Sequence, residues 1–66
     1  MKGPDNRPAV KLIGNDGNAF VVMGRVSAAL RNEGADNEFI DKYINESESG
    51  DYDNLLRVAM EYADIE

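Results

Sequence analysis

The chain has 66 residues, with 13 acidic against 7 basic side chains, a formal net charge of −6, and no histidine or cysteine. This composition excludes a Cys/His zinc site, a disulfide framework and a Ser-His-Asp or Cys-His catalytic pair. The length indicates one domain, since a chain of this size buries only about 60% of the surface that it exposes when unfolded.

The N-terminal segment holds two prolines and a glycine among polar residues, which predicts a flexible lead-in over residues 1–8 and a single compact domain over residues 9–66. The lead-in lacks the apolar stretch of a secretory signal. No apolar run in the chain approaches the roughly 20 residues that cross a bilayer. We therefore expect a cytoplasmic protein with no membrane partner.

The first expected element is a strand over the β-branched run from Val10 to Ile13, followed by a dense turn signal over residues 14–18. Residues 19–23 admit two interpretations. Asp16-Gly17 between two apolar runs favours a hairpin with a return strand, whereas Asn18 as an N-cap favours a helix.

The helical interpretation is the stronger of the two, because an apolar pattern continues well beyond residue 23. Phe20, Met23 and Leu30 recur at helical spacing, and Gly34 is a natural residue to end the helix. A helix accounts for about fifteen residues and a hairpin for about five. We therefore expect strand, turn and helix.

Two further helices are expected in the acidic half of the chain. Residues 36–46 offer Asp36 and Asn37 as competing caps, and their apolar residues share one face: Phe39, Ile40, Tyr43 and Ile44. After a break at Gly50, Asp51 caps a third helix with apolar positions at Tyr52, Leu55, Leu56, Ala59, Met60 and Ala63.

The last residues alternate apolar and polar, so Ile65 can place a short strand beside the first one, which needs a partner for its backbone groups. The expected fold class is α+β and mostly helical. Its order is β-α-α-α-β, with three short helices against a minimal two-stranded sheet.

Charge is distributed unevenly along the chain. Residues 1–32 hold five basic and two acidic side chains, whereas residues 33–66 hold two basic and eleven acidic ones. The second helix carries Glu38, Asp41 and Glu46 against a single Lys42. Carboxylates repel phosphates, so we expect no direct nucleic-acid binding.

The same carboxylates, Glu38, Asp41 and Glu46, form a candidate surface for a basic protein partner. A sharper alternative is an inhibitor that mimics DNA and binds a DNA-handling protein. The plainer interpretation is a solvated helix face that keeps a small domain soluble.

A second candidate partner surface is a strip of small residues on the first helix, Gly24, Ser27 and Ala28. Glycine within a helix costs about 1 kcal/mol relative to alanine, so a close approach by another backbone would explain it. That backbone belongs to the third helix in one interpretation, and to a partner or a second copy in the other. Tyr43, Tyr52 and Tyr62 are possible interface anchors or ordinary core residues.

No cofactor or metal is expected. Setting Gly50 as the sixth residue of a calcium loop puts Leu56 where the loop requires a bidentate glutamate. Gly14-Asn15-Asp16-Gly17 lacks the spacing and the lysine of a phosphate-binding loop, so we interpret it as a tight turn.

Catalysis is not expected either. Asp51 and Asp53 lie two residues apart in a first helical turn, so their carboxylates point to different faces. A chain this short also has difficulty enclosing a pocket of roughly 300 Å³ or more. We expect a non-enzymatic protein.

Two strings, Asp16-Gly17-Asn18-Ala19-Phe20 and Ser49-Gly50-Asp51-Tyr52-Asp53, together with the surrounding pattern over residues 10–66, resemble a group of small hypothetical proteins from bacteria and phages. The resemblance implies one compact domain beginning near Val10 and carries no activity, ligand or partner. The expected function is a small interaction or accessory domain that binds another protein or itself.

Overall fold

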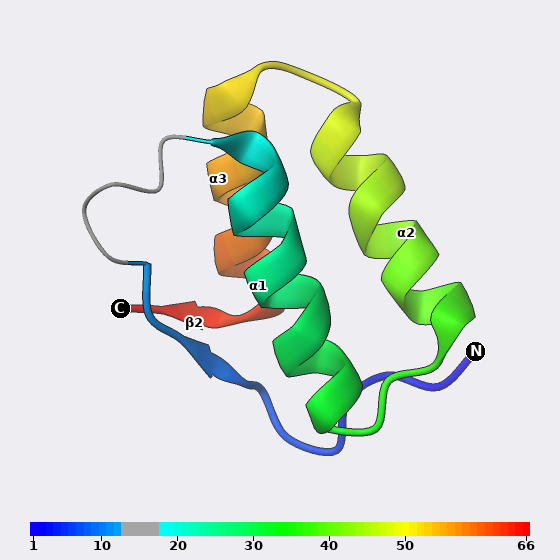
Figure 1. Cartoon of the computed structure of the whole chain (residues 1–66). Coiled ribbons are helices and arrows are strands. Elements are labelled where there is room, and N and C mark those ends of the chain that lie inside the picture. Colours follow the sequence, from blue (N-terminus) through cyan, green and yellow to red (C-terminus); the bar gives the residue numbers. More distant parts are fainter. Residues whose placement is uncertain (13–17) are drawn as a thin grey trace.

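The computed structural model describes residues 1–12 and 18–66, and in that part of the chain the elements follow the expected order. They are β1 (Ala9–Val10), α1 (Ala19–Asn32), α2 (Asn37–Glu48), α3 (Tyr52–Tyr62) and β2 (Asp64–Ile65). The three helices pack against one another, and the small sheet lies beside α1 and α3 (Figure 1). The β-α-α-α-β fold class is confirmed, and so is a helix from residue 19. The predicted turn at residues 14–17 lies outside the described residues.

Each helix begins at a polar residue that its sequence position identifies as an N-cap. The side chain of Asn18 accepts a hydrogen bond from the N–H of Phe20, Asp36 from that of Phe39, and Asp51 from that of Asn54. These side chains satisfy donors that the first turn of a helix leaves without a partner. Of the two competing caps of α2, the structure selects Asp36.

The end of α1 explains how the chain reverses toward α2. Gly34 has φ +97°, a left-handed conformation that glycine adopts without a steric penalty. The N–H of Gly34 bonds the carbonyl of Arg31, and the N–H of Ala35 bonds that of Leu30, both at 3.0 Å. This pair of bonds is a Schellman motif. It places Ala35 in the core beside Leu30.

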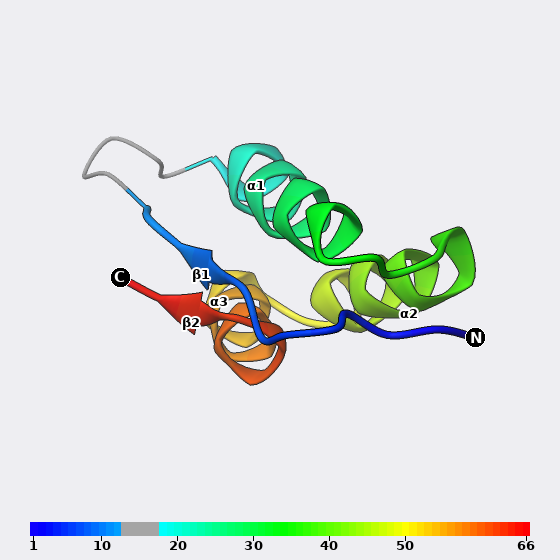
Figure 2. The same ribbon diagram turned by 90° about the horizontal axis from the view of Figure 1, so that it is seen from below.

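The sheet joins two segments from opposite ends of the sequence. β1 and β2 are parallel, with Ala9 beside Asp64 and Val10 beside Ile65. The ladder extends to the hydrogen bond from the N–H of Leu12 to the carbonyl of Glu66. The expected pairing of the first strand with Ile65 is confirmed, and Figure 2 shows the two strands side by side.

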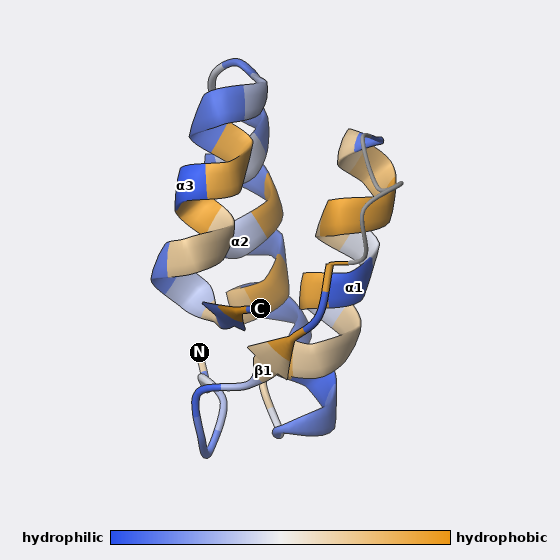
Figure 3. Ribbon diagram, turned by 90° about the vertical axis from the view of Figure 1, so that its left-hand side faces the viewer, coloured by the Kyte–Doolittle hydropathy of each residue, from blue (hydrophilic) through white to orange (hydrophobic). Residues whose placement is uncertain are grey.

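The core lies between the helices and the inner face of the sheet. Its largest fully buried side chains are Tyr43, Leu30, Val22, Val26 and Ser47. Figure 3 shows the hydrophobic stretches that run along β1 and the helices, with hydrophilic residues where α2 connects to α3.

Three of the expected apolar positions lie largely outside this core. Phe20 is 77% exposed, Met60 57% and Tyr52 38%, so these apolar positions do not belong to the core. The buried face of α3 instead includes Val58, because the side of a helix that is covered depends on where its neighbours lie as well as on its own spacing.

Residues 1–8, for which we expected a flexible lead-in, run past the α1–α2 connection toward β1 (Figure 2). The N–H of Asp5 bonds the carbonyl of Glu33 at 2.7 Å, and the N–H of Asp36 bonds the carbonyl of Lys2 at 2.9 Å. Pro8 is buried. The segment therefore contacts both the α1–α2 junction and the sheet.

Within residues 1–12 and 18–66, no helix is both long enough and apolar enough to cross a bilayer.

Candidate partner-binding surfaces

The three small residues of the predicted strip on α1 do not share one environment. Gly24 is exposed, and a Cβ built on it would meet no atom within 4 Å. Ala28 is exposed and lines a shallow hollow between β1 and α1, whereas Ser27 is half-buried with no hydrogen-bond partner for its hydroxyl among the described residues. The interpretation of Gly24 as a close contact with the third helix is wrong.

The three carboxylates predicted as an acidic surface also separate in space. Glu38 and Asp41 are exposed on α2, and Glu38 lies 3.7 Å from the α-ammonium of Met1. Glu46 faces α3, where it accepts a hydrogen bond from Tyr62. At 100° per residue it lies about 80° around the helix from Glu38 and about 140° from Asp41. The helix therefore presents Glu38 and Asp41 outward, while Glu46 takes part in an intramolecular cluster.

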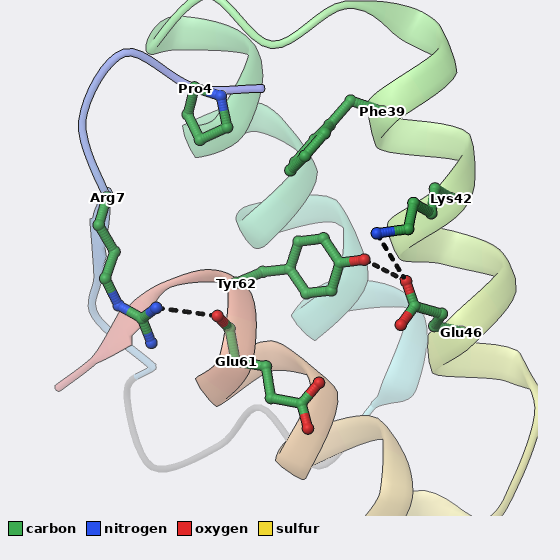
Figure 4. A pocket seen from close by; sticks show the side chains of 7 residues that line it. All are labelled: Pro4, Arg7, Phe39, Lys42, Glu46, Glu61 and Tyr62. Atoms are coloured by element: carbon green, nitrogen blue, oxygen red, sulfur yellow. Dashed lines mark hydrogen bonds and ion pairs between the residues drawn. The ribbon is translucent and has the colours of Figure 1, made fainter. Parts of the chain in front are cut away.

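That cluster lines a hollow of about 480 Å³ between α2, α3 and the N-terminal segment (Figure 4). The hydroxyl of Tyr62 donates to a carboxylate oxygen of Glu46, and the ammonium of Lys42 lies 3.8 Å from the same oxygen. Lys42 also lies over the rings of Phe39 and Tyr62, at 6.0 and 5.7 Å from their centroids. Burial and the carboxylate of Glu46 raise the pKa of Tyr62.

On the opposite side of this hollow, Arg7 caps the end of α3. Its guanidinium donates to the carbonyls of Met60, Glu61 and Ala63, and its Nε lies 2.7 Å from a carboxylate oxygen of Asp64. A cation is favourable at the carboxyl end of a helix, where carbonyls lack intrahelical donors. Lys42, Glu46, Tyr62 and Arg7 thus all take part in bonds within the chain, which indicates a structural role for this hollow.

A second hollow, which we term the helix-end groove, has a different character. It measures about 350 Å³ and is lined mainly by Phe20 and Met23 of α1, Ser47 and Glu48 of α2, and Tyr52 and Leu55 of α3. It lies where α1 begins and where α2 connects to α3 (Figure 1). Its aromatic rim and apolar floor are typical of a surface that receives an apolar side chain.

Two buried hydroxyls lie on the inner face of α2, one helical turn apart. Tyr43 is fully buried and Ser47 is 1% exposed, and neither hydroxyl forms a well-aligned hydrogen bond among the described residues. Burial raises the pKa of Tyr43, since its anion would be poorly solvated there, and the neighbouring hydroxyl of Ser47 opposes this shift in part. Ser47 also borders the helix-end groove, although its hydroxyl oxygen is buried.

The helix-end groove was not predicted from the sequence. Its two aromatic residues, Phe20 and Tyr52, each lie within the first two positions of a helix. An aromatic residue at a helix start falls on the end of the molecule when the two helix starts are neighbours in space. The aromatic residues at the two helix starts were therefore a usable signal, but the helical spacing of Phe20 from Met23 favoured a position in the core.

Among the described residues, no group of three or more Asp and Glu side chains is arranged to hold a metal ion. Comparison with known protein families, with curated proteins and with solved structures found no match to this chain.

Proposed function

We propose that the chain is a non-enzymatic protein-interaction domain whose helix-end groove binds a partner segment carrying an apolar anchor flanked by basic residues. The observation that supports this proposal most directly is the exposure of Phe20, at 77%, beside the half-exposed ring of Tyr52. Aromatic side chains that border a pocket are the residues that most often dominate binding energy at interfaces.

The charge around the groove supports the choice of a basic partner. Glu48 and Asp51 line its rim, and none of the described residues that line it is basic. These carboxylates belong to the half of the chain that carries eleven acidic side chains. Complementary charge accelerates encounter and selects the partner, while the apolar anchor supplies most of the affinity.

The groove is open and about 350 Å³ in volume, which suits one or two apolar side chains at the surface of a partner. Its walls come from three helices whose starts and ends are fixed by caps, including Asp51 at the start of α3. A preformed groove of this kind binds without a large ordering cost.

Titration of the isotope-labelled chain with two synthetic peptides tests the proposal. Both peptides contain the same leucine and phenylalanine anchors, flanked by lysine in one and by glutamate in the other. We expect amide shifts around the groove with the lysine peptide, and about tenfold weaker binding for Phe20→Ala. Glu48→Lys should weaken the lysine peptide selectively.

Met60→Ala is the matched control, because Met60 is a similarly exposed apolar residue that does not line the groove. It should leave binding unchanged. Equal losses from Phe20→Ala and Met60→Ala, or equal binding of the two peptides, would contradict the proposal.

A further inference from the structure

One edge of β1 forms no hydrogen bonds within the two-stranded sheet. The ladder to β2 engages the carbonyls of Pro8 and Val10 and the N–H of Leu12. Hydrogen-bonding groups alternate from one side of a strand to the other along the chain. The N–H and C=O groups of Ala9 and Lys11 therefore point away from β2, and no described residue bonds them.

The space beside this edge is a shallow hollow of about 340 Å³ between β1 and α1, lined by Ala9, Lys11, Arg25, Ala28, Ala29 and Asn32. Figures 2 and 3 show β1 between β2 on one side and α1 on the other. Ala28 and Ala29 on the helix side are small, so their side chains leave room for a further backbone. The four backbone groups and the hollow together form a template for an added strand.

The charges at the hollow indicate which kind of segment it accepts. Lys11 and Arg25 line it, and no described acidic residue does. Both cations lie in the part of the chain that carries five basic side chains against two acidic ones. A second copy of the chain, added through its own β1 edge, would bring another Lys11 to the same place and would be repelled.

We propose that the outer edge of β1 binds an extended acidic segment of another protein, which pairs with Ala9 and Lys11 as an added strand. Its backbone supplies the hydrogen bonds, and its acidic side chains contact Lys11. This surface is separate from the helix-end groove, since the two hollows share no lining residue. The chain is then an adaptor that holds two segments of opposite charge.

The test uses fluorescent synthetic peptides with the wild-type chain, so that no variant has to fold. One peptide alternates glutamate and valine, a second has lysine in place of glutamate, and a third is the acidic peptide with N-methyl groups on alternate backbone nitrogens. N-methylation removes donors from one edge of a strand and leaves charge unchanged. We expect the acidic peptide to bind at least about tenfold more tightly than either of the other two.

Two variants locate the site. Lys11→Glu should weaken the acidic peptide and strengthen the lysine peptide, while Ala28→Leu should weaken the acidic peptide by filling the hollow. Both positions are exposed, so thermal unfolding should show a folded chain. Phe20→Ala is the control, and it should leave this binding unchanged whether or not the helix-end groove is functional.

Equal binding of the acidic peptide and its N-methylated form would overturn the proposal, because strand addition requires those donors. A reversible dimer of the wild-type chain would overturn the proposal as well, if Lys11→Glu made that dimer more stable. The edge of β1 would then accept a second copy of the chain. Amide shifts confined to Ala9, Lys11 and their neighbours on α1 would support it.

Discussion

Gly24 and Gly34 differ in backbone conformation and in the space available for an added Cβ. Gly24 lies within α1, is exposed, and has open space where a Cβ would project. We expect Gly24→Ala to raise the free energy of unfolding by about 1 kcal/mol, because alanine restricts the unfolded chain and favours a helix. Urea denaturation followed by circular dichroism measures the change.

Gly34 supplies the contrasting control. It has φ +97°, and an added Cβ would lie 2.7 Å from the Nζ of Lys2. Gly34→Ala should lower the free energy of unfolding by about 1 kcal/mol or more, since a left-handed conformation strains any residue with a Cβ. A destabilising Gly24→Ala would mean that α1 packs differently from the structure.

Ser47 carries a buried hydroxyl that forms no well-aligned hydrogen bond with a described residue, so removing it should help the fold. We expect Ser47→Ala to raise the free energy of unfolding by about 1 kcal/mol, both because an unpartnered buried hydroxyl is unfavourable and because alanine is the better helix former. Thermal and urea unfolding check the result.

The matched control for this substitution is Ser49→Ala on the same helix end. The hydroxyl of Ser49 is exposed and donates to the carbonyl of Glu46 at 2.7 Å. Its removal should be neutral or slightly destabilising. A loss of stability on Ser47→Ala would indicate that the hydroxyl stabilises the buried hydroxyl of Tyr43, one turn away.

At the scale of elements, Asp36 joins the start of α2 to the N-terminal segment. Its carboxylate accepts hydrogen bonds from the N–H of Phe39 at 2.8 Å and from that of Lys2 at 2.7 Å. These bonds hold the pKa of Asp36 below its ordinary value of 3.8. Because the pKa is lower in the folded state, this stabilisation is present above the unfolded pKa and is lost as the pH falls through the folded one.

We therefore expect wild type and Asp36→Asn to differ most in unfolding free energy above about pH 5, and to converge toward about pH 2. Asparagine still caps a helix, so the variant should remain folded. Unfolding in urea across this pH range is the measurement. Asp41→Asn changes an exposed residue on the same helix and serves as the control. Its unfolding free energy should change with pH in parallel with that of wild type.

Arg7 links the N-terminal segment to the carboxyl end of α3. Its guanidinium reaches three carbonyls at the end of α3 through two separate nitrogens, an arrangement that the single nitrogen of a lysine ammonium does not reproduce. We expect Arg7→Gln to lower the free energy of unfolding by about 1–2 kcal/mol and Arg7→Lys to have an intermediate effect. The exposed pair with Asp64 should contribute little, so Asp64→Asn serves as the control.

Short sequence signals predict where these helices start and end. They do not predict which face of each helix the rest of the protein covers. Asn18, Asp36, Asp51 and Gly34 act on backbone groups within a few positions, so their effects can be deduced locally. Phe20 is about 110° from the middle of the buried face of α1 at 100° per residue, yet its spacing from Met23 is helical. Only the positions of the other helices show that this side is uncovered.

At the scale of the whole molecule, contacts between residues far apart in the sequence are the features that the sequence predicts least well. The alternation around Ile65 predicted a strand and its partner, but parallel pairing with β1 depends on how three helices cross between them. The guanidinium of Arg7 and the carboxylate of Asp64 are in contact across 57 positions. Such a pairing has no local signature. The hollows beside β1 and at the helix starts arise from the same long-range placement.

The core is one cluster that includes Val10 of β1 and Ala63 beside β2, together with buried residues of every helix. A chain of this size has no second core that would stay folded after the sheet opens. We therefore expect the amides of Asp64, Ala35 and Ala63 to exchange with deuterium through the same unfolding step. Their exchange should show the same urea dependence by native-state hydrogen exchange.

Val10→Ala tests this coupling, since Val10 is 5% exposed against the core. It should lower the exchange free energy of all three amides by one shared increment of about 1–2 kcal/mol. If the Asp64 amide instead exchanged early and without urea dependence, the strands would open apart from the helices. The edge of β1 would then be formed only part of the time, and an added strand would bind more weakly in proportion to that fraction.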